Sequence, residues 1–190
     1  MTSRIRLVFA LFCVALLAPL ALRADAPNLV TNPGFETGDF SGWTTIPAAS
    51  GSLFFVDGSP HSGDYAAWFG GVIPGGYDTI TQIVPTQAGL GTTFSFWLAD
   101  QWAPPAGFQA YWDGTQVMGT IDPGPFGYTF YSFNVAATGN DTISFSGYQE
   151  PSYFTLDDVS VTQTPEPSSL FLLGTGLLAM AGLAHRKLFA

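Results

Sequence analysis

The chain has 190 residues, a formal net charge of −9 and a mean hydropathy of +0.27, and its charged residues are unevenly placed. All five Lys and Arg residues lie outside the segment 25–164, whereas 13 of the 14 acidic residues lie inside it, Glu166 being the exception. A segment without Lys or Arg cannot neutralise phosphates, which excludes binding to nucleic acid and to anionic lipid surfaces.

The first residues are typical of a secretory signal peptide. Two arginines precede the apolar run 7–22, and small residues follow at Ala24 and Ala26. A positive flank, a short apolar stretch and small residues at its exit are the three parts of such a signal. We therefore predict that residues 1–24 are a helical signal peptide, which is removed on export.

The central segment 25–164 is predicted to be one all-β domain. It is rich in Gly, Pro, Ser, Thr and aromatic residues, and no apolar stripe of 3.6-residue period reaches helical length. Turn sequences such as "DGSPHSGD", "APPAG" and "DPGPFG" separate short alternating runs. Those runs lie at 52–56, 65–70, 79–84, 93–99, 108–112, 128–136, 141–148 and 153–162. Short strands with regular turns predict a β-sandwich, although periodicity alone leaves open a jelly-roll or an immunoglobulin-like strand order.

One turn in this segment is specific enough to predict a hairpin. In "YWDGTQV", Asp113-Gly114 stands between two strand-like runs. A two-residue Asp-Gly connection matches the twist of paired antiparallel strands because both residues tolerate positive φ.

The C-terminal segment 165–190 reads as a membrane helix that follows an extended, accessible stretch. Pro165-Glu166-Pro167 precedes an apolar run, 170–184, and the basic pair Arg186-Lys187 follows. A run of about 15 residues spans roughly 22 Å, which is short for a permanent bilayer span. The basic pair is expected to stay on the cytoplasmic side. A plain C-terminal anchor without processing is the alternative.

The same tail, "TPEPSSLFLLGTGLLAMAGLAHRK", resembles a PEP-CTERM sorting signal. This resemblance implies export across the inner membrane of a Gram-negative-type bacterium and retention in that membrane by the tail. It also implies processing by an exosortase near Pro165, Glu166 and Pro167, and final placement at the cell surface or outside the cell. Such systems accompany the production of extracellular polysaccharide.

The two ends of the central segment resemble bacterial galactose-binding-like jelly rolls, the architecture of many carbohydrate-binding modules. The resemblance rests on "NLVTNPGFETGDFSGWT" at 28–44 and "PSYFTLDDVSV" at 151–161. It implies a structural calcium ion that joins the opening segment to the final strand, with Glu36 and Asp157 as ligands. Calcium takes six to eight oxygens, so backbone carbonyls would contribute. Adjacent Asp157 and Asp158 would point to opposite faces of a regular strand. The alternative is that these acids accept hydrogen bonds from backbone amides without metal.

Aromatic rings are the candidates for ligand binding, because a flat ring can stack on the apolar face of a sugar. Trp97 and Trp112 lie inside predicted strands, where one face of each strand could present them. Trp102 and Tyr77 lie in loop-like stretches and are expected to be exposed, and Tyr148 is a further loop candidate. The alternative for each ring is a place in the core, since the chain has 17 Phe residues and few long aliphatic ones in this segment.

Catalysis is not expected. The central segment has one histidine, His61, and no cysteine, which are too few ligands for a zinc site. A Ser-His-Asp arrangement is not favoured either, because His61 lies in the loop-like stretch "SPHSG". Many of its acidic residues adjoin Gly or Pro and are turn formers. The sequence therefore predicts an exported, non-enzymatic surface or matrix protein with a polysaccharide-binding β-sandwich. The alternative is a calcium-stabilised structural or adhesive coat protein that has no sugar site.

Overall fold

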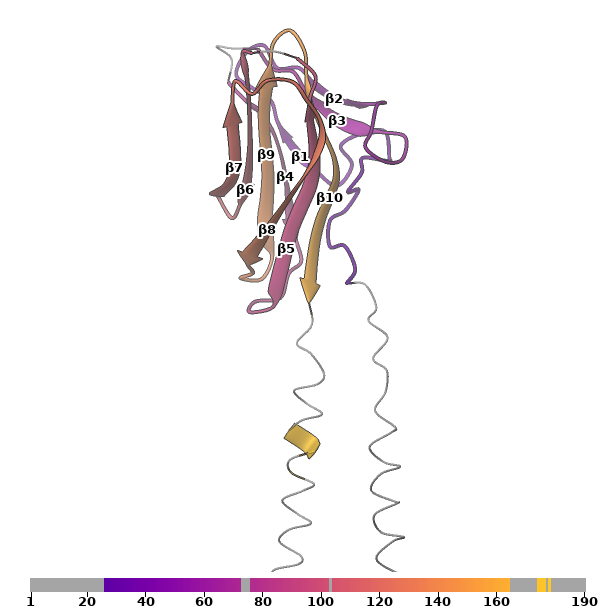
Figure 1. Ribbon diagram of the computed structural model, residues 1–190, viewed down its shortest axis with the longest axis vertical. Coiled ribbons are helices and arrows are strands. Elements are labelled where there is room, and N and C mark those ends of the chain that lie inside the picture. The colour runs from indigo at the N-terminus through magenta and orange to yellow at the C-terminus, as the bar shows by residue number, and fades with distance from the viewer. Residues whose placement is uncertain (1–25, 73–75, 103, 165–173, 177, 179–190) are drawn as a thin grey trace, which may run out of the picture.

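A computed structural model of the chain describes residues 26–72, 76–102, 104–164, 174–176 and 178 (Figure 1). Ten strands form two five-stranded antiparallel sheets that pack face to face. In spatial order, sheet A consists of β1 (Thr44–Ile46), β4 (Asp78–Val84), β9 (Asp141–Gln149), β6 (Ala106–Trp112) and β7 (Thr115–Ile121). Sheet B consists of β2 (Phe54–Asp57), β3 (Ala66–Phe69), β10 (Phe154–Thr164), β5 (Gly91–Asp100) and β8 (Phe126–Ala136). The chain is thus an all-β sandwich, as the sequence predicted.

Each of the eight predicted runs overlaps a strand, the predicted hairpin anticipated β7, and β1 was not expected. β1 is three exposed residues without alternation, and β7 alternates only weakly between exposed and half-buried positions. The predicted hairpin joins β6 to β7, with Asp113 at φ 46° and Gly114 at φ 73°. Both angles lie in the left-handed region that this two-residue turn requires.

Aromatic side chains fill the space between the sheets. Seven phenylalanines are fully buried: Phe35, Phe69, Phe94, Phe96, Phe108, Phe145 and Phe154. Phe145 on sheet A lies at their centre, with its ring centroid 5.0 Å from that of Phe96 and 5.7 Å from that of Phe94 on sheet B. Edge-to-face and tilted pairs of this kind stabilise a core beyond the area that they bury.

Several carboxylates are buried without a cation and are held by donors from turns. Asp78 accepts hydrogen bonds from Ala48 N (2.9 Å), Leu53 N (2.9 Å) and Ser52 Oγ (2.6 Å), so it ties the start of β4 to the loop before β2. Asp141, at the start of β9, accepts bonds from the Thr138 amide and from two threonine hydroxyls. Buried charges are tolerated when their oxygens are satisfied in this way.

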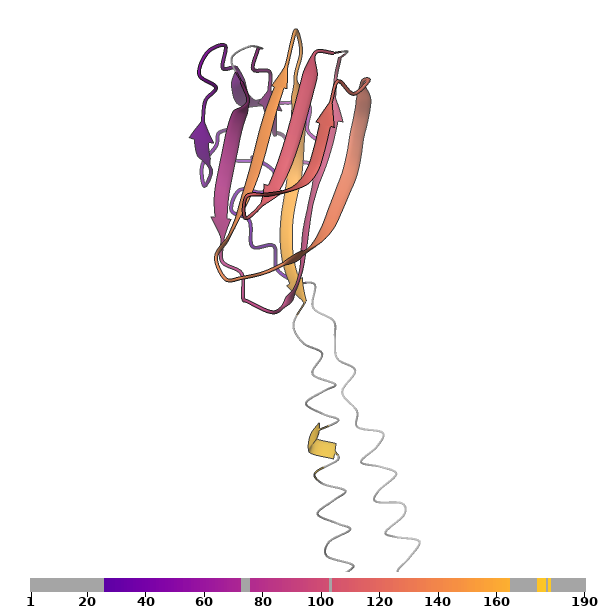
Figure 2. The same ribbon diagram turned by 90° about the vertical axis from the view of Figure 1, so that its left-hand side faces the viewer.

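The first and last described parts of the sandwich lie side by side at one end of the molecule (Figures 1 and 2). Leu29 N donates to Val161 O at 2.9 Å, and Asn28 both donates to Val159 O and accepts from Val161 N. The opening segment is therefore fastened along β10.

Little of the predicted terminal helices falls within the described residues. Residues 174–176 and 178 are helical, and the signal peptide, Pro165, Glu166, Pro167 and the rest of the tail lie outside the described part of the chain. Within the described ranges, no helix has the length and apolar character that crossing a membrane requires.

Candidate functional site

The outer face of sheet A carries a band of hydroxyl and amide groups. Because side chains alternate along β4, β9 and β6, Phe145 and its inward neighbours enter the core while the residues between them face outward. The pairing of the strands aligns two outward rows, Thr81–Ser144–Tyr111 and Thr79–Ser146–Gln109. We call this surface, together with Tyr77 and Tyr148, the tyrosine–hydroxyl face.

Hydrogen bonds join the members of these rows. The hydroxyls of Thr79 and Ser146 lie 2.8 Å apart, and Ser144 Oγ donates to Thr81 Oγ1 at 3.0 Å. Tyr111 Oη donates to Gln109 Oε1 at 2.5 Å, which fixes its half-buried ring over the sheet. The face therefore presents prearranged donors and acceptors beside one flat ring.

A pair of tyrosines closes one end of this face. The rings of Tyr77 and Tyr148 meet edge to face with centroids 4.8 Å apart, so that Tyr148 supports the more exposed Tyr77. Both lie over Gly107, where an added Cβ would come within 2.5 Å of the Tyr148 ring and 2.9 Å of Tyr77 Oη. Glycine at this position is therefore what allows the two rings to lie against the sheet.

The surroundings of Tyr77 and Tyr148 keep both phenol hydroxyls protonated. Burial raises the pKa of Tyr77, and the nearby Tyr148, Tyr111 and Asp122 raise it further. Burial and then Asp122 likewise raise the pKa of Tyr148. The two hydroxyls can therefore donate hydrogen bonds at neutral pH, and a neutral polyhydroxylated ligand would match the face chemically.

Two of the predicted rings have faces that are already occupied. Trp112 is 5% exposed, its ring packs on Phe94, and its Nε1 donates to Ala136 O at 2.9 Å, so it is part of the core. Trp97 lies on the outer side of sheet B, where the His61 ring stacks on it at a centroid distance of 3.7 Å. The Trp112 ring is therefore enclosed by the core, and His61 covers one face of the Trp97 ring.

Trp102 and the Tyr77–Tyr148 pair lie near one end of sheet A. Trp102 is 57% exposed in the loop between β5 and β6, and its carbonyl accepts a bond from Gln149, the last residue of β9. Tyr77 stands against Tyr148, the residue next to Gln149. The structure thus brings the neighbourhood of Trp102 and the tyrosine pair to the same edge of the tyrosine–hydroxyl face.

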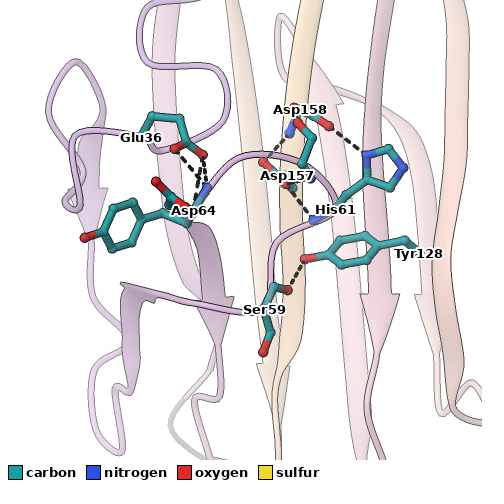
Figure 3. A network of polar contacts seen from close by, with 9 residues as sticks. Glu36, Ser59, His61, Asp64, Tyr128, Asp157 and Asp158 are labelled. Carbon is teal, nitrogen blue, oxygen red and sulfur yellow. Dashed lines mark hydrogen bonds and ion pairs between the residues drawn. The ribbon is translucent and has the colours of Figure 1, made fainter.

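A network of carboxylates on the opposite sheet holds the loop 58–65 (Figure 3). Asp157 is fully buried, and its Oδ2 accepts bonds from His61 N (2.8 Å) and Ser62 N (3.0 Å). Burial raises the pKa of Asp157 to about 6, against the lowering effect of these amide hydrogen bonds. The side chain of His61 lies above it, between Asp158 and Trp97.

The neighbouring Asp158 reaches the same loop. Its Oδ2 lies 2.7 Å from His61 Nδ1, and its Oδ1 accepts from Ser62 Oγ at 2.8 Å. The opposite orientations expected for Asp157 and Asp158 hold only in a regular strand, and here the register shifts between Asp157 and Ser160 while Asp158 has φ 47°. This bulge turns both carboxylates toward one loop.

Glu36 fastens the other side of that loop. Its carboxylate accepts bonds from Asp64 N (3.0 Å) and Tyr65 N (3.3 Å), and it packs against Gly63. The carboxylates of Glu36 and Asp157 therefore both accept hydrogen bonds from backbone amides, as expected for these acids when no metal is bound. Among the described residues, no three His, Cys, Asp or Glu side chains are grouped to hold a metal. In this arrangement amide hydrogens approach the carboxylate oxygens that a calcium ion would need.

The sequence alone did not identify Tyr111 or Gln109, and it placed Tyr148 in a loop although this residue lies in β9. The available signal was the alternation in "TITQIV", "DTISFSGY" and "FQAYW", which places hydroxyl, amide and Tyr side chains on one face of three strands. Their pairing into adjacent rows could not be read from the sequence, because the strand order was left open.

Comparisons with known proteins identify the C-terminal segment by its sequence. Residues 163–187 match the PEP-CTERM protein-sorting motif, a signal that marks exported proteins for membrane-anchored sorting. A comparison with curated protein sequences gives no significant match.

Solved structures with a similar fold include carbohydrate-binding modules. TmCBM61, solved in complex with β-1,4-galactotriose, is 20% identical with a TM-score of 0.56, over 73% of this chain and all of that one. The CBM22-1 xylan-binding domain from Paenibacillus barcinonensis Xyn10C is 12% identical with a TM-score of 0.50, over 75% of this chain and 99% of that one. The enzymatically active domain of tailspike protein 4 from bacteriophage CBA120 is 14% identical with a TM-score of 0.57, over 72% of this chain but 21% of that one. At these identities the comparisons establish the fold, a jelly-roll β-sandwich like that of carbohydrate-binding modules.

Proposed function

We propose that this chain is an exported, non-enzymatic surface or matrix protein whose β-sandwich binds extracellular polysaccharide through the tyrosine–hydroxyl face of sheet A. The observation that carries the proposal is the combination of the Tyr77–Tyr148 pair with the aligned rows of Ser, Thr, Gln and Tyr side chains. Aromatic faces bind the apolar side of a pyranose, and fixed hydroxyl and amide groups bind its hydroxyls. Trp102 would extend the aromatic surface at the same end.

The order of segments in this proposal is that of an exosortase substrate. Residues 1–24 are a signal peptide, residues 25–164 are the sandwich, and residues 165–190 hold the chain in the membrane until an exosortase cleaves near Pro165, Glu166 and Pro167. The match of residues 163–187 to the sorting motif supports this order. The mature domain would then stay at the cell surface or enter the matrix of a Gram-negative-type bacterium.

The chemistry of the face argues for neutral glycans. The outward positions of its two rows carry no charged side chain, and the segment 25–164 has no Lys or Arg. An anionic polysaccharide would meet 13 carboxylates and no cationic partner. Two of the similar solved structures bind neutral chains, a β-1,4-galactotriose and a xylan, and these make suitable first ligands.

The decisive experiment is calorimetric titration of the full chain, purified in detergent, with neutral polysaccharides that include β-1,4-galactan and xylan. We expect saturable binding that Tyr111→Ala weakens by about tenfold, since one stacked ring contributes on the order of 1 kcal/mol. Trp102→Ala should weaken it as well. Phe130→Ala is the matched control, because this ring is 52% exposed on sheet B. Absence of saturable binding across the panel would reject the sugar-binding function.

The alternative is a structural or adhesive coat protein stabilised by calcium. Three carboxylates, Glu36, Asp157 and Asp158, hold the loop 58–65 to the sandwich, and a rearrangement of that loop would be needed to free their oxygens for an ion. A rise in the melting temperature with calcium, but not with magnesium at equal ionic strength, would favour this alternative. Loss of that rise in Glu36→Gln would assign it to this site.

A further inference from the structure

One side of the sandwich is closed by the chain itself. The opening segment, which precedes β1, lies beside β2 and β4 on this side. The Phe40 ring lies 5.3 Å from the ring of Phe54 on β2, and Gln82 on β4 donates to Gly42 O at 3.0 Å. The core between the two sheets is therefore covered here by residues from before the first strand.

The opposite side of the sandwich, formed by β7 and β8, is left partly open. β7 ends sheet A and β8 ends sheet B, and within the described ranges neither pairs with a further strand (Figure 2). Both strands carry half-buried apolar side chains that pack against the core: Val117, Met118, Tyr131, Phe133 and Val135. A partly open core beside two unpaired strand edges is a surface that a partner can bury.

Among the described strands, β8 is the longest that lies at the edge of a sheet. It has 11 residues, against three in β1, four in β2 and seven in β7. Proteins commonly protect an edge by keeping it short or by placing a proline or a charged residue in it. β8 contains neither proline nor charge, and its pairing with β5 is regular from Thr129 to Ala136. Such an edge is a template for pairing with another extended strand.

The distribution of charge favours a second copy of the chain as the partner. The segment 25–164 carries 13 carboxylates and no Lys or Arg, so two copies repel each other over most of their surface. Between Asp113 and Asp141 the only charged residue is Asp122, which lies in the connection from β7 to β8. Two copies can therefore meet at this side without placing carboxylates against each other. A cationic partner would instead be drawn to the acidic surfaces elsewhere.

We propose that this side binds a second copy of the chain through antiparallel pairing of the two β8 strands, which makes sheet B continuous across a twofold dimer. Pairing centred on Tyr131, the midpoint of the strand, uses its full length. The exposed Phe130 then lies opposite Ser132 of the second copy, and the two half-buried Tyr131 rings meet on the inner side of the shared sheet. The proposal does not depend on polysaccharide binding, because β8 is not part of the tyrosine–hydroxyl face.

The test is sedimentation equilibrium of the full chain in detergent over a range of protein concentrations. We expect a protein mass that rises with concentration to twice the chain mass of 20.2 kDa. The association should tighten as sodium chloride rises from about 0.01 M to about 0.1 M, because screening weakens the repulsion between two acidic copies. A monomer at every concentration, or an association that weakens over this range of salt, would overturn the proposal.

Matched substitutions locate the interface. Ser132→Glu and Asn134→Glu each place a carboxylate at an exposed position of β8, where pairing would bring it against the second copy. Each should weaken association at least about tenfold. Thr45→Glu adds the same charge at an exposed position of β1, on the opposite edge of the sandwich, and should have little effect. Association that resists both β8 variants, or that Thr45→Glu weakens equally, would assign it to another surface. The second β8 variant serves if the first fails to fold.

Cross-linking separates pairing of β8 from association through the apolar ends of the chain. The only native cysteine is Cys13, so a Cys13→Ser chain carries a single thiol when Ser132→Cys or Thr45→Cys is added. In the proposed dimer the two Ser132 positions are diagonal neighbours, which lie about 7–8 Å apart in an antiparallel pair. A short bis-maleimide should therefore join two Ser132→Cys chains but not two Thr45→Cys chains. Equal cross-linking of the two variants, or none at Ser132→Cys, would overturn the proposal.

Discussion

The domain accommodates buried carboxylates through hydrogen bonds rather than ion pairs. Asp78 and Asp157 are fully buried, and each accepts from at least two backbone amides. For Asp141, burial opposes ionisation, but bonds from Thr138 and Thr86 outweigh it and lower the pKa of that carboxyl. These residues fasten loops to strands, a task that an ion pair with Lys or Arg could not perform here because the segment 25–164 has neither.

The buried carboxyl group of Asp157 should make the stability of the domain depend on pH. Its folded-state pKa of about 6 is above the value of about 3.9 for an unfolded chain. The folded state therefore binds the proton more tightly, and this residue's contribution to the free energy of unfolding falls as pH rises from about 4 to 6. We expect the wild type to lose roughly 2 kcal/mol relative to Asp157→Asn across this range. Urea unfolding of both proteins at several pH values measures it, and parallel curves would contradict the assignment.

A substitution of Gly107 tests the role of the Tyr77–Tyr148 pair in the tyrosine–hydroxyl face. A methyl group at this position would lie 2.5 Å from the Tyr148 ring, so Gly107→Ala must displace the Tyr77–Tyr148 pair. We expect a loss of about 1–3 kcal/mol in stability from overpacking, together with weaker polysaccharide binding. Gly91→Ala serves as the control because its Cβ would meet no atom within 4 Å. Unchanged binding in Gly107→Ala would show that the tyrosine pair is not part of the site.

Among elements, the hairpin β6–β7 shows what a local signal can specify. Asp113 and Gly114 both have positive φ, and the turn aligns Tyr111 with Gln116 across the two strands. Register at this edge of sheet A is thus set by two residues of turn chemistry. The outward position of Tyr111 depends on that register.

A substitution of Gly114 measures how much the backbone conformation of this turn contributes to stability. Its φ is 73° and an added Cβ would meet no atom within 4 Å, so Gly114→Ala introduces backbone strain without a steric clash. We expect a loss of about 1 kcal/mol in the free energy of unfolding. Gly124→Ala, which is also open but has no positive φ, should be nearly neutral. Chemical denaturation of the two variants compares them directly, and equal stability would argue against the turn assignment.

Elements with strong alternation were predictable from the sequence, and those set by distant partners were not. Regular apolar positions indicate β5 and β9, whereas the exposed β1 is a strand only because β4 lies beside it. The bulge at Asp157 could not be foreseen, because it depends on the loop 58–65 packing over β10. For the same reason the sequence could indicate aromatic candidates but could not tell that Trp112 is core and that His61 covers Trp97.

At the scale of the whole molecule, repulsion among carboxylates opposes folding. The segment 25–164 holds 13 acidic residues and no Lys or Arg, so like charges are brought together in the compact state. Screening reduces this repulsion as the Debye length falls from about 30 Å at 0.01 M salt to about 10 Å at 0.1 M. We therefore expect the melting temperature to rise with sodium chloride over this range, as measured by calorimetry. A fall would mean that attractive interactions dominate the electrostatics.

The place of β10 has a mechanical consequence. This strand leads to the C-terminal segment and lies at the centre of sheet B, paired with β3 on one side and β5 on the other. Tension applied at Thr164 would load both ladders along the strand, so their hydrogen bonds would have to shear together rather than open one at a time. The opening segment, bonded to β10 at Val159 and Val161, would share that load. Under the proposed function, a domain that binds a polymer through sheet A and is pulled from the end of β10 resists force along a strand that is paired on both sides.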